Sequence, residues 1–184
     1  MAKIYIDQGH NPENPNAGAE GNGYREQDLV YEIGIRTAEI LRRNGQQVRL
    51  SRPTPSTQLG ISNSASLRAR VEEANSWGAD LFVSLHANAS SITSASGTEA
   101  YVYRVPSAAY DLAEDIVEAV SENTGLMNRG VFARTNLYVL RRTRMPAALI
   151  ELGFITNPGD AVLMADAPQL FAEGVAQGIL NYLQ

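Results

Sequence analysis

The chain has 184 residues, enough for one domain with a sizeable core, and carries a net charge of −5 with an isoelectric point near 5.1. This acidic balance argues against nucleic acid as a partner and against electrostatic attachment to anionic membranes or wall polymers. The absence of cysteine excludes disulfides, thiolate metal sites and a cysteine nucleophile, and it fits work outside the cell.

Neither a targeting segment nor a membrane span is expected. Met1-Ala2-Lys3 runs directly into a strand pattern, which leaves no signal peptide in this chain. No apolar run approaches the ~20 residues needed to cross a bilayer, so we expect no membrane insertion. The chain is therefore expected to be either a trimmed domain or a protein released without a signal.

The chain opens with a strand that leads to the first of its two histidines. Residues 3–7, with apolar Ile4 and Ile6, predict a short strand, and His10 follows just beyond it. In open α/β sheets, ligands and catalytic groups gather at the carboxyl ends of strands. Residues 8–25 form a polar loop rich in Gly, Asn and Pro, and a loop this long in a compact domain is usually functional or disordered.

Helical periodicity begins near Arg25 and ends at Gly45, with acids in the first turn and arginines in the last, as the helix dipole favours. The elements expected next are a strand over 47–51, a loop over 52–63, a helix capped by Ser64 or Ser66 and ended by Gly78, and a strand over 80–86.

The second histidine, His86, ends a buried-type strand, as His10 follows one. One interpretation is two structural histidines. The other is a zinc site, because imidazole is the usual zinc ligand and catalytic zinc takes three histidines or two with a carboxylate.

The second half continues the alternation of strands and helices. The expected elements are a polar loop over 88–97, a strand over 98–103 near a sheet edge, a helix from Pro106-Ser107 to Gly125, extended pieces over 131–133 and 138–140, a strand over 147–150 ending at Glu151, a helix capped by Asn157 and a last helix from Asp166. This order predicts a single three-layer α/β domain, with a mostly parallel or mixed twisted sheet flanked by helices.

Two carboxylates are needed if two histidines bind a catalytic zinc: one as third ligand, and one outside the metal shell to accept a proton from water. Glu26 is the better ligand candidate, because a helix start holds it more firmly than the loop holds Glu13 or Glu20. Its alternative role is to complement the helix dipole. Glu151 suits the base, because an acid in an apolar strand needs a partner or a function.

The order of several short motifs makes the resemblance to a known family specific. The motifs are Ile6–His10, Tyr24–Leu29, Leu67–Arg70 with Ala74-Asn75, Ser84–Asn88, Val139–Arg141 and Pro146–Asn157. With them, the chain resembles the zinc-dependent N-acetylmuramoyl-L-alanine amidase family of peptidoglycan hydrolases over essentially its whole length. The resemblance implies that His10, Glu26 and His86 bind one Zn²⁺ per chain and that Glu151 is the catalytic carboxylate. It also selects Glu26 over Glu20.

The same resemblance implies a zinc-exopeptidase-like fold, with residues 1–184 as the catalytic domain. It implies hydrolysis of the amide between N-acetylmuramic acid and L-alanine at the bacterial cell wall, outside the cell, as in an autolysin or endolysin. We expect a monomer that lacks a wall-anchoring module. Some relatives carry an inhibitory helix, but the expected elements fill the segment between His86 and Glu151, so an open groove is expected here.

The sequence departs from the family around the first histidine. Gln8 precedes Gly9, and Asn11-Pro12 follows His10, where the family usually has Pro and then Gly-Gly. The ligand itself is kept, so the departure concerns loop shape and substrate fit.

Two other functions stay open at this point. A zinc carboxypeptidase uses a similar scaffold and needs an arginine near the zinc, for which Arg134, Arg141, Arg142 and Arg144 are available. A wall-binding module without catalysis is opposed by the presence of all four site residues.

Overall fold

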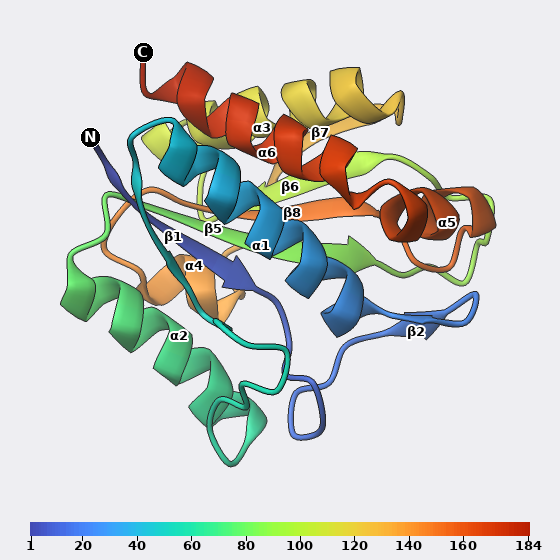
Figure 1. The fold of residues 1–184 in the computed structure, drawn as a ribbon, viewed down its shortest axis with the longest axis horizontal. Helices are drawn as coiled ribbons and strands as arrows, with labels where there is room; N and C mark the ends of the chain where they lie inside the picture. Colours follow the sequence, from blue (N-terminus) through green and yellow to red (C-terminus); the bar gives the residue numbers. More distant parts are fainter.

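A six-stranded sheet forms the middle layer of the computed structural model, which describes residues 1–184 (Figure 1). Its strands, in spatial order, are β4 (Gln47–Leu50), β1 (Lys3–Gln8), β5 (Leu81–Asn88), β8 (Ala147–Phe154), β6 (Thr98–Val102) and β7 (Asn128–Ala133). The first four are mutually parallel, whereas β6 runs antiparallel to β8 and pairs in parallel with β7. The prediction of a mixed α/β sheet is confirmed.

Helices cover both faces of this sheet. On one face lie α1 (Glu26–Arg43), α3 (Ala108–Thr124) and α6 (Pro168–Tyr182), and on the other lie α2 (Asn63–Trp77) and α4 (Tyr138–Arg142). The short helix α5 (Pro158–Asp166) joins β8 to α6. Figure 1 shows α1 and α6 crossing in front of the sheet, with α2 and α4 on the far side.

Alternate side chains of the central strands feed two separate cores. Ile4 and Ile6 of β1 pack with α1, α3 and α6, whereas Tyr5 faces α2 and stacks on Phe82 with ring centroids 5.6 Å apart. Strands buried on both faces read as continuous apolar runs, which is why their sequence pattern is strong.

Close packing of α3 on α6 depends on glycine. A Cβ atom at Gly178 would lie 2.3 Å from Cα of Ile116, and one at Gly174 would lie 2.6 Å from Cα of Val120. The two backbones therefore approach more closely than any side chain would permit, which holds α3 on the face opposite α2 and α4.

Three local expectations about element type or capping were wrong. The 8–25 loop contains a small hairpin, β2 (Glu20–Gly21) with β3 (Tyr24–Arg25). The helix α2 is capped by Ser62, whose Oγ accepts from the Ala65 amide at 3.1 Å, because Ser66 is buried and bonded elsewhere. The strand β6 lies near the edge of the sheet, as expected, with only β7 outside it.

Residues 138–140 are helical rather than extended. Tyr-Val-Leu favours a strand by local propensity, but α4 buries Val139 and Leu140 against α2 and β8, and packing overrides propensity.

Two strands are longer than expected. The strand β8 continues past Glu151 to Phe154, because Leu152 and Phe154 are also buried, and β5 continues past His86 to Asn88. His86 and Glu151 therefore lie within paired strands rather than at free ends, whereas His10 follows the end of β1.

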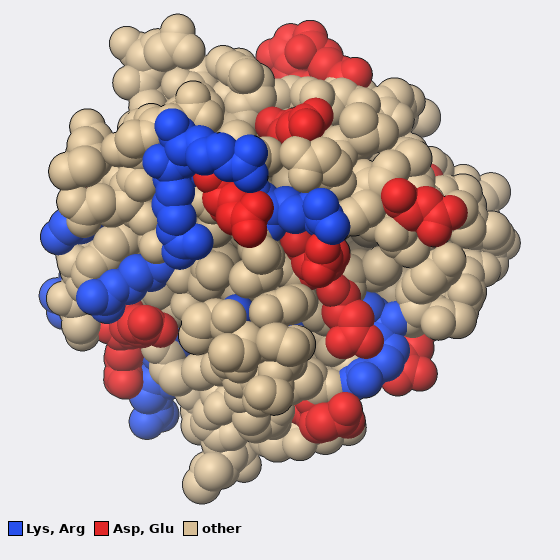
Figure 2. Space-filling model, viewed as in Figure 1, with Lys and Arg blue, Asp and Glu red and all other residues tan.

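The outer surface of α1 carries alternating charges. Figure 2 shows basic and acidic side chains interspersed along this helix. Arg36 pairs with Glu32 at 2.6 Å, and Arg43 pairs with Glu39 at 3.3 Å. Such exposed pairs contribute little to stability and leave no field of one sign on this face. None of the helices combines the length and apolar character needed to cross a membrane.

Candidate metal centre

Three side chains far apart in sequence converge beyond the carboxyl end of β1. One possible donor atom each from His10, Glu26 and His86 lies within 4.8 Å of the others. Oε1 of Glu26 is 3.1 Å from Nε2 of His10 and 3.1 Å from Nδ1 of His86. The two imidazole rings meet edge to face with centroids 4.9 Å apart. The donors therefore surround a single point.

Glu26 is held as the sequence argument anticipated, at the first residue of α1. Its Oε2 accepts from the Ala19 amide at 2.9 Å, and its Oε1 also accepts from the Ala87 amide at 3.0 Å. The residue is buried. Burial alone would raise the pKa of this carboxyl, but hydrogen bonds and charge from His10 and His86 hold the pKa well below its usual range. Glu26 is thus an ionised carboxylate in the interior.

The conformation of His10 is unusual, and the surrounding backbone is fitted to it. Its φ is 64°, in the left-handed region that few non-glycine residues adopt. A Cβ atom at Gly9 would lie 2.6 Å from Cε1 of His86, and one at Gly18 would lie 2.8 Å from Oε2 of Glu26. Glycine at these two positions lets the loop close tightly over the three donors.

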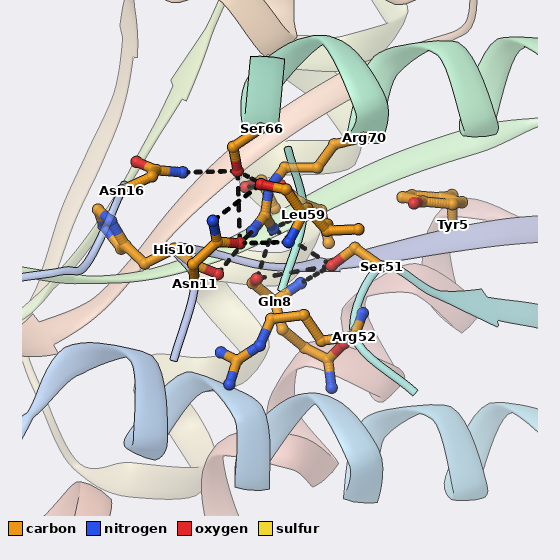
Figure 3. Close-up of polar contacts among 12 residues, drawn as sticks. Tyr5, Gln8, His10, Asn11, Asn16, Ser51, Arg52, Leu59, Ser66 and Arg70 are labelled. Carbon is orange, nitrogen blue, oxygen red and sulfur yellow. Dashed lines mark hydrogen bonds and ion pairs between the residues drawn. The ribbon is translucent and has the colours of Figure 1, made fainter. Parts of the chain in front are cut away.

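A buried arginine supports His10 from behind (Figure 3). Nη2 of Arg70 donates to the backbone oxygen of His10 at 2.5 Å, and its Nη1 donates to Oδ1 of Asp7 at 2.5 Å and to the Gln8 oxygen at 2.7 Å. The other Asp7 oxygen accepts from Ser84 Oγ at 2.7 Å. Burial raises the pKa of Asp7, but Arg70 and Ser84 more than offset this, so Asp7 stays ionised.

Sequence analysis did not assign these roles to Arg70 and Asp7, although a signal was present. Arg70 lies three residues after Leu67 and four before Ala74, on the apolar side of the helix, and Asp7 interrupts an apolar strand. A charged residue on each of two inward faces indicates a buried ion pair.

The loop after His10 is also tied down. Asn11 donates to the backbone oxygen of Pro15 at 2.8 Å. Asn11 also donates to the backbone oxygen of Leu59 at 2.9 Å, and Asn16 donates to Ser66 Oγ at 3.0 Å (Figure 3). Three side chains thus fix a segment that composition alone would leave undefined.

Glu151 lies beside this group but outside it. In the sheet it is the register partner of His86 on β5 and of Glu99 on β6, so its side chain shares their face. Its Oε2 is buried and has no hydrogen-bond partner. Burial, together with the charges of Glu26 and Glu99, raises the pKa of Glu151 to about 8, and Arg134 opposes this rise. Glu151 can therefore exchange a proton near neutral pH.

The rival acids lie apart from the three donors. Glu20 is exposed in β2, and Glu13 is 77% exposed and pairs with Arg25 at 3.2 Å. Of the four arginines that a carboxypeptidase could use to bind a free carboxylate, Arg134 has its guanidinium 4.7 Å from the Tyr101 ring centroid. Its positive charge opposes the rise in the pKa of Glu151.

The donor set fits a zinc ion chemically. Two imidazoles and one carboxylate are ligands that Zn²⁺ accepts in catalytic sites, which keep a further position open. Oε1 of Glu26 lies 3.1 Å from one ring nitrogen of each histidine, so a single ion could contact all three donors.

Comparison with known proteins agrees with this chemistry. A family model described as N-acetylmuramoyl-L-alanine amidase matches residues 4–181. The amidase CwlM of Bacillus licheniformis is 36% identical over 186 residues, which cover 100% of this chain and 68% of that protein. The structure of the amidase AmiC2 of Nostoc punctiforme is 34% identical with a TM-score of 0.86, over 100% of this chain and 97% of that one.

The catalytic domain of the amidase CwlV from Bacillus (Paenibacillus) polymyxa var. colistinus is 32% identical, with a TM-score of 0.87, over 100% of this chain and 98% of that one. These matches extend over nearly the full length of the sequence and of the fold. The chain belongs to the N-acetylmuramoyl-L-alanine amidase family.

Proposed function

We propose that this chain hydrolyses the amide bond between N-acetylmuramic acid and L-alanine in bacterial peptidoglycan, with residues 1–184 as its catalytic domain. The observation that carries the proposal is the convergence of His10, Glu26 and His86 next to Glu151 on the neighbouring strand. Family membership supplies the substrate class.

His10, Glu26 and His86 would hold one Zn²⁺. When bound, the ion supplies Lewis-acid chemistry: it polarises a carbonyl oxygen and makes a water molecule more acidic. Glu26 contributes a carboxylate that is already ionised, so binding need not displace a proton from it. Arg70 fixes the backbone of His10 and thereby the position of its imidazole.

Glu151 acts as general base and then as general acid. It accepts a proton from the attacking water and delivers it to the departing amino group of L-alanine, which leaves as a free amine. A group in this role works best when its pKa lies near the working pH, and the surroundings of Glu151 raise its pKa in that direction. A wall-binding module would have no use for such a carboxylate.

The substrate places the protein's work at the cell wall, outside the cell, where it would act in wall lysis or remodelling. A groove open to a long glycan strand suits this substrate. The only long helix between His86 and Glu151 is α3, which packs against α6 on the opposite face of the sheet and leaves the metal centre uncovered by it. We propose a monomer, because one chain contains all four residues.

Metal dependence tests the proposal. Purified peptidoglycan is incubated with the protein, and released amino groups are measured before and after treatment with a chelator. Release should stop with the chelator and return on addition of one equivalent of Zn²⁺. Unchanged release from a preparation that contains no zinc-type metal would contradict the proposal.

A further inference from the structure

A small cavity of about 120 Å³ opens directly beside the two histidines. It lies between the sheet and the pair α2 and α4, on the face opposite α1. The apolar residues that line it are Leu67, Leu137, Tyr138, Val139 and Leu149. Because both His10 and His86 also line it, the cavity is continuous with the metal centre rather than a separate site.

The charged groups that border the cavity are already paired. Asp7 accepts from Arg70 at 2.5 Å and from Ser84 at 2.7 Å. Arg70 also donates to the backbone oxygens of Gln8 and His10 and to Oδ1 of Asn11. At the rim, the amide nitrogen of Asn16 is bound to Ser66 Oγ at 3.0 Å. Asp7 and Arg70 therefore satisfy each other, and an apolar group that enters the cavity would leave water for contact with the five apolar side chains of its lining.

The size of the cavity limits what enters it. Its walls come from rigid elements: Val139 and Leu149 are 5% and 6% exposed, and both belong to the core cluster under α2 and α4. A volume of about 120 Å³ accommodates a small alkyl group. Apolar cavities of this kind bind small apolar groups in preference to water.

We propose that this cavity is a specificity pocket for a methyl group next to the scissile amide. The inference rests on the proposed function. Both carbon atoms that flank this amide carry a methyl group, one on the lactyl ether of the sugar and one on L-alanine. A substrate whose amide carbonyl lies at His10 and His86 brings one of these methyl groups to the cavity mouth.

Four synthetic substrates test the pocket and identify its occupant. The parent carries lactyl and L-alanine, a second has glycine for alanine, a third has glycolyl for lactyl, and a fourth has the longer α-aminobutyrate for alanine. Loss of the bound methyl group should lower kcat/KM by about 4-fold to 10-fold. A lower kcat/KM for the glycine substrate identifies the alanine methyl as the occupant. A lower kcat/KM for the glycolyl substrate identifies the lactyl methyl.

Variants at Leu67, a half-buried residue of α2, give a matched comparison. When the alanine methyl is the occupant, Leu67→Ala should widen the pocket and reduce the preference for the parent over the α-aminobutyrate substrate. Leu67→Trp should fill the pocket and abolish discrimination between the parent and its methyl-free analogue. Leu163→Ala, at a half-buried leucine of α5 that does not line the cavity, should leave every ratio unchanged.

Xenon binding gives a readout that needs neither metal nor turnover. Xenon should shift the methyl NMR signals of Val139 and Leu149 in the metal-free protein, and Leu67→Trp should remove these shifts. Equal kcat/KM for the parent and both methyl-free substrates, in protein that cleaves the parent, would overturn the pocket. Failure to cleave the parent would instead overturn the proposed function, and the xenon result would still report on the cavity.

Discussion

The guanidinium of Arg70 lies 2.5 Å from the carboxylate of Asp7, and both side chains are almost fully buried. Nη2 of the same Arg70 donates a hydrogen bond to the backbone oxygen of His10. An ion pair in the interior of the sheet is thus coupled to the position of a proposed metal ligand. Stability and metal affinity should therefore depend on the same residue.

Arg70→Met should lower the free energy of unfolding by about 3–5 kcal/mol, because it leaves the Asp7 charge buried without its partner. Denaturant unfolding of the metal-free protein measures this change. The double variant Asp7→Asn/Arg70→Met is the control, and should recover a substantial part of the loss. An Arg70→Met protein as stable as wild type would show that the pair has no structural role.

Exchanges at the two proposed functional glutamates should have different effects. Glu151→Gln should keep zinc bound and reduce turnover by about 10²-fold to 10⁴-fold, the usual cost of a missing general base. Glu26→Ala should lower zinc affinity, and Glu26→Gln is a milder change that keeps the side-chain shape and one of the two oxygens that accept from the Ala19 and Ala87 amides. Metal content and initial rate are measured on each purified variant.

Glu20→Ala is the control, since Glu20 is exposed on the β2 hairpin and should affect neither quantity. Loss of zinc in Glu151→Gln, or near-normal turnover, would remove Glu151 from the role of base.

Glu151 should also make the metal-free protein less stable as pH rises. Its pKa is raised from 4.5 to about 8 in the folded state, so between these values the folded protein retains a proton that the unfolded chain releases. The stability that this proton confers is complete below pH ~4.5 and is lost as pH rises through about 8. Glu151→Gln should therefore be more stable than wild type at pH 8, by about 1–3 kcal/mol, and similar at pH 4.5.

Denaturation of chelator-treated proteins at several pH values tests this. A difference between the two proteins that stays constant with pH would show that Glu151 titrates normally.

Close packing at Gly9 predicts a steric effect on metal binding. In Gly9→Ala the new methyl group would collide with the His86 ring and with the Leu85 oxygen, each 2.6 Å away, so the two histidines must separate. Zinc affinity and activity should both fall, as titration with a zinc indicator would show. Gly45→Asn, at an open position after α1 with a φ of 78°, should change neither. A Gly9→Ala protein with normal zinc affinity would show that the loop relaxes freely.

The elements that could be predicted from the sequence are those with a strong local pattern. Strands buried on both faces, such as the one through Ile4 and Ile6, and helices ended by Gly78 or Gly125 have local causes, and the structure contains them. The motif around Glu151 was visible, but not the continuation of its strand to Phe154, because that depends on pairing with β5.

Features decided by tertiary contacts could not be predicted in this way. The helix α4 exists because Val139 and Leu140 pack under α2, against the local preference of their side chains. The link from Arg70 to His10 spans 60 residues of sequence and involves a backbone oxygen, so residue types reveal only that Arg70 points inward. The left-handed φ of His10 had no local signal either.

The proposed activity is the hydrolysis of one bond, between the muramic acid lactyl group and L-alanine. Digestion of purified peptidoglycan, followed by mass identification of the new ends, tests it most directly. We predict peptides with free L-alanine amino termini and intact glycan strands without new reducing ends, and no such products with Glu151→Gln. New reducing sugar ends, or the release of single terminal amino acids as by a carboxypeptidase, would contradict the claim.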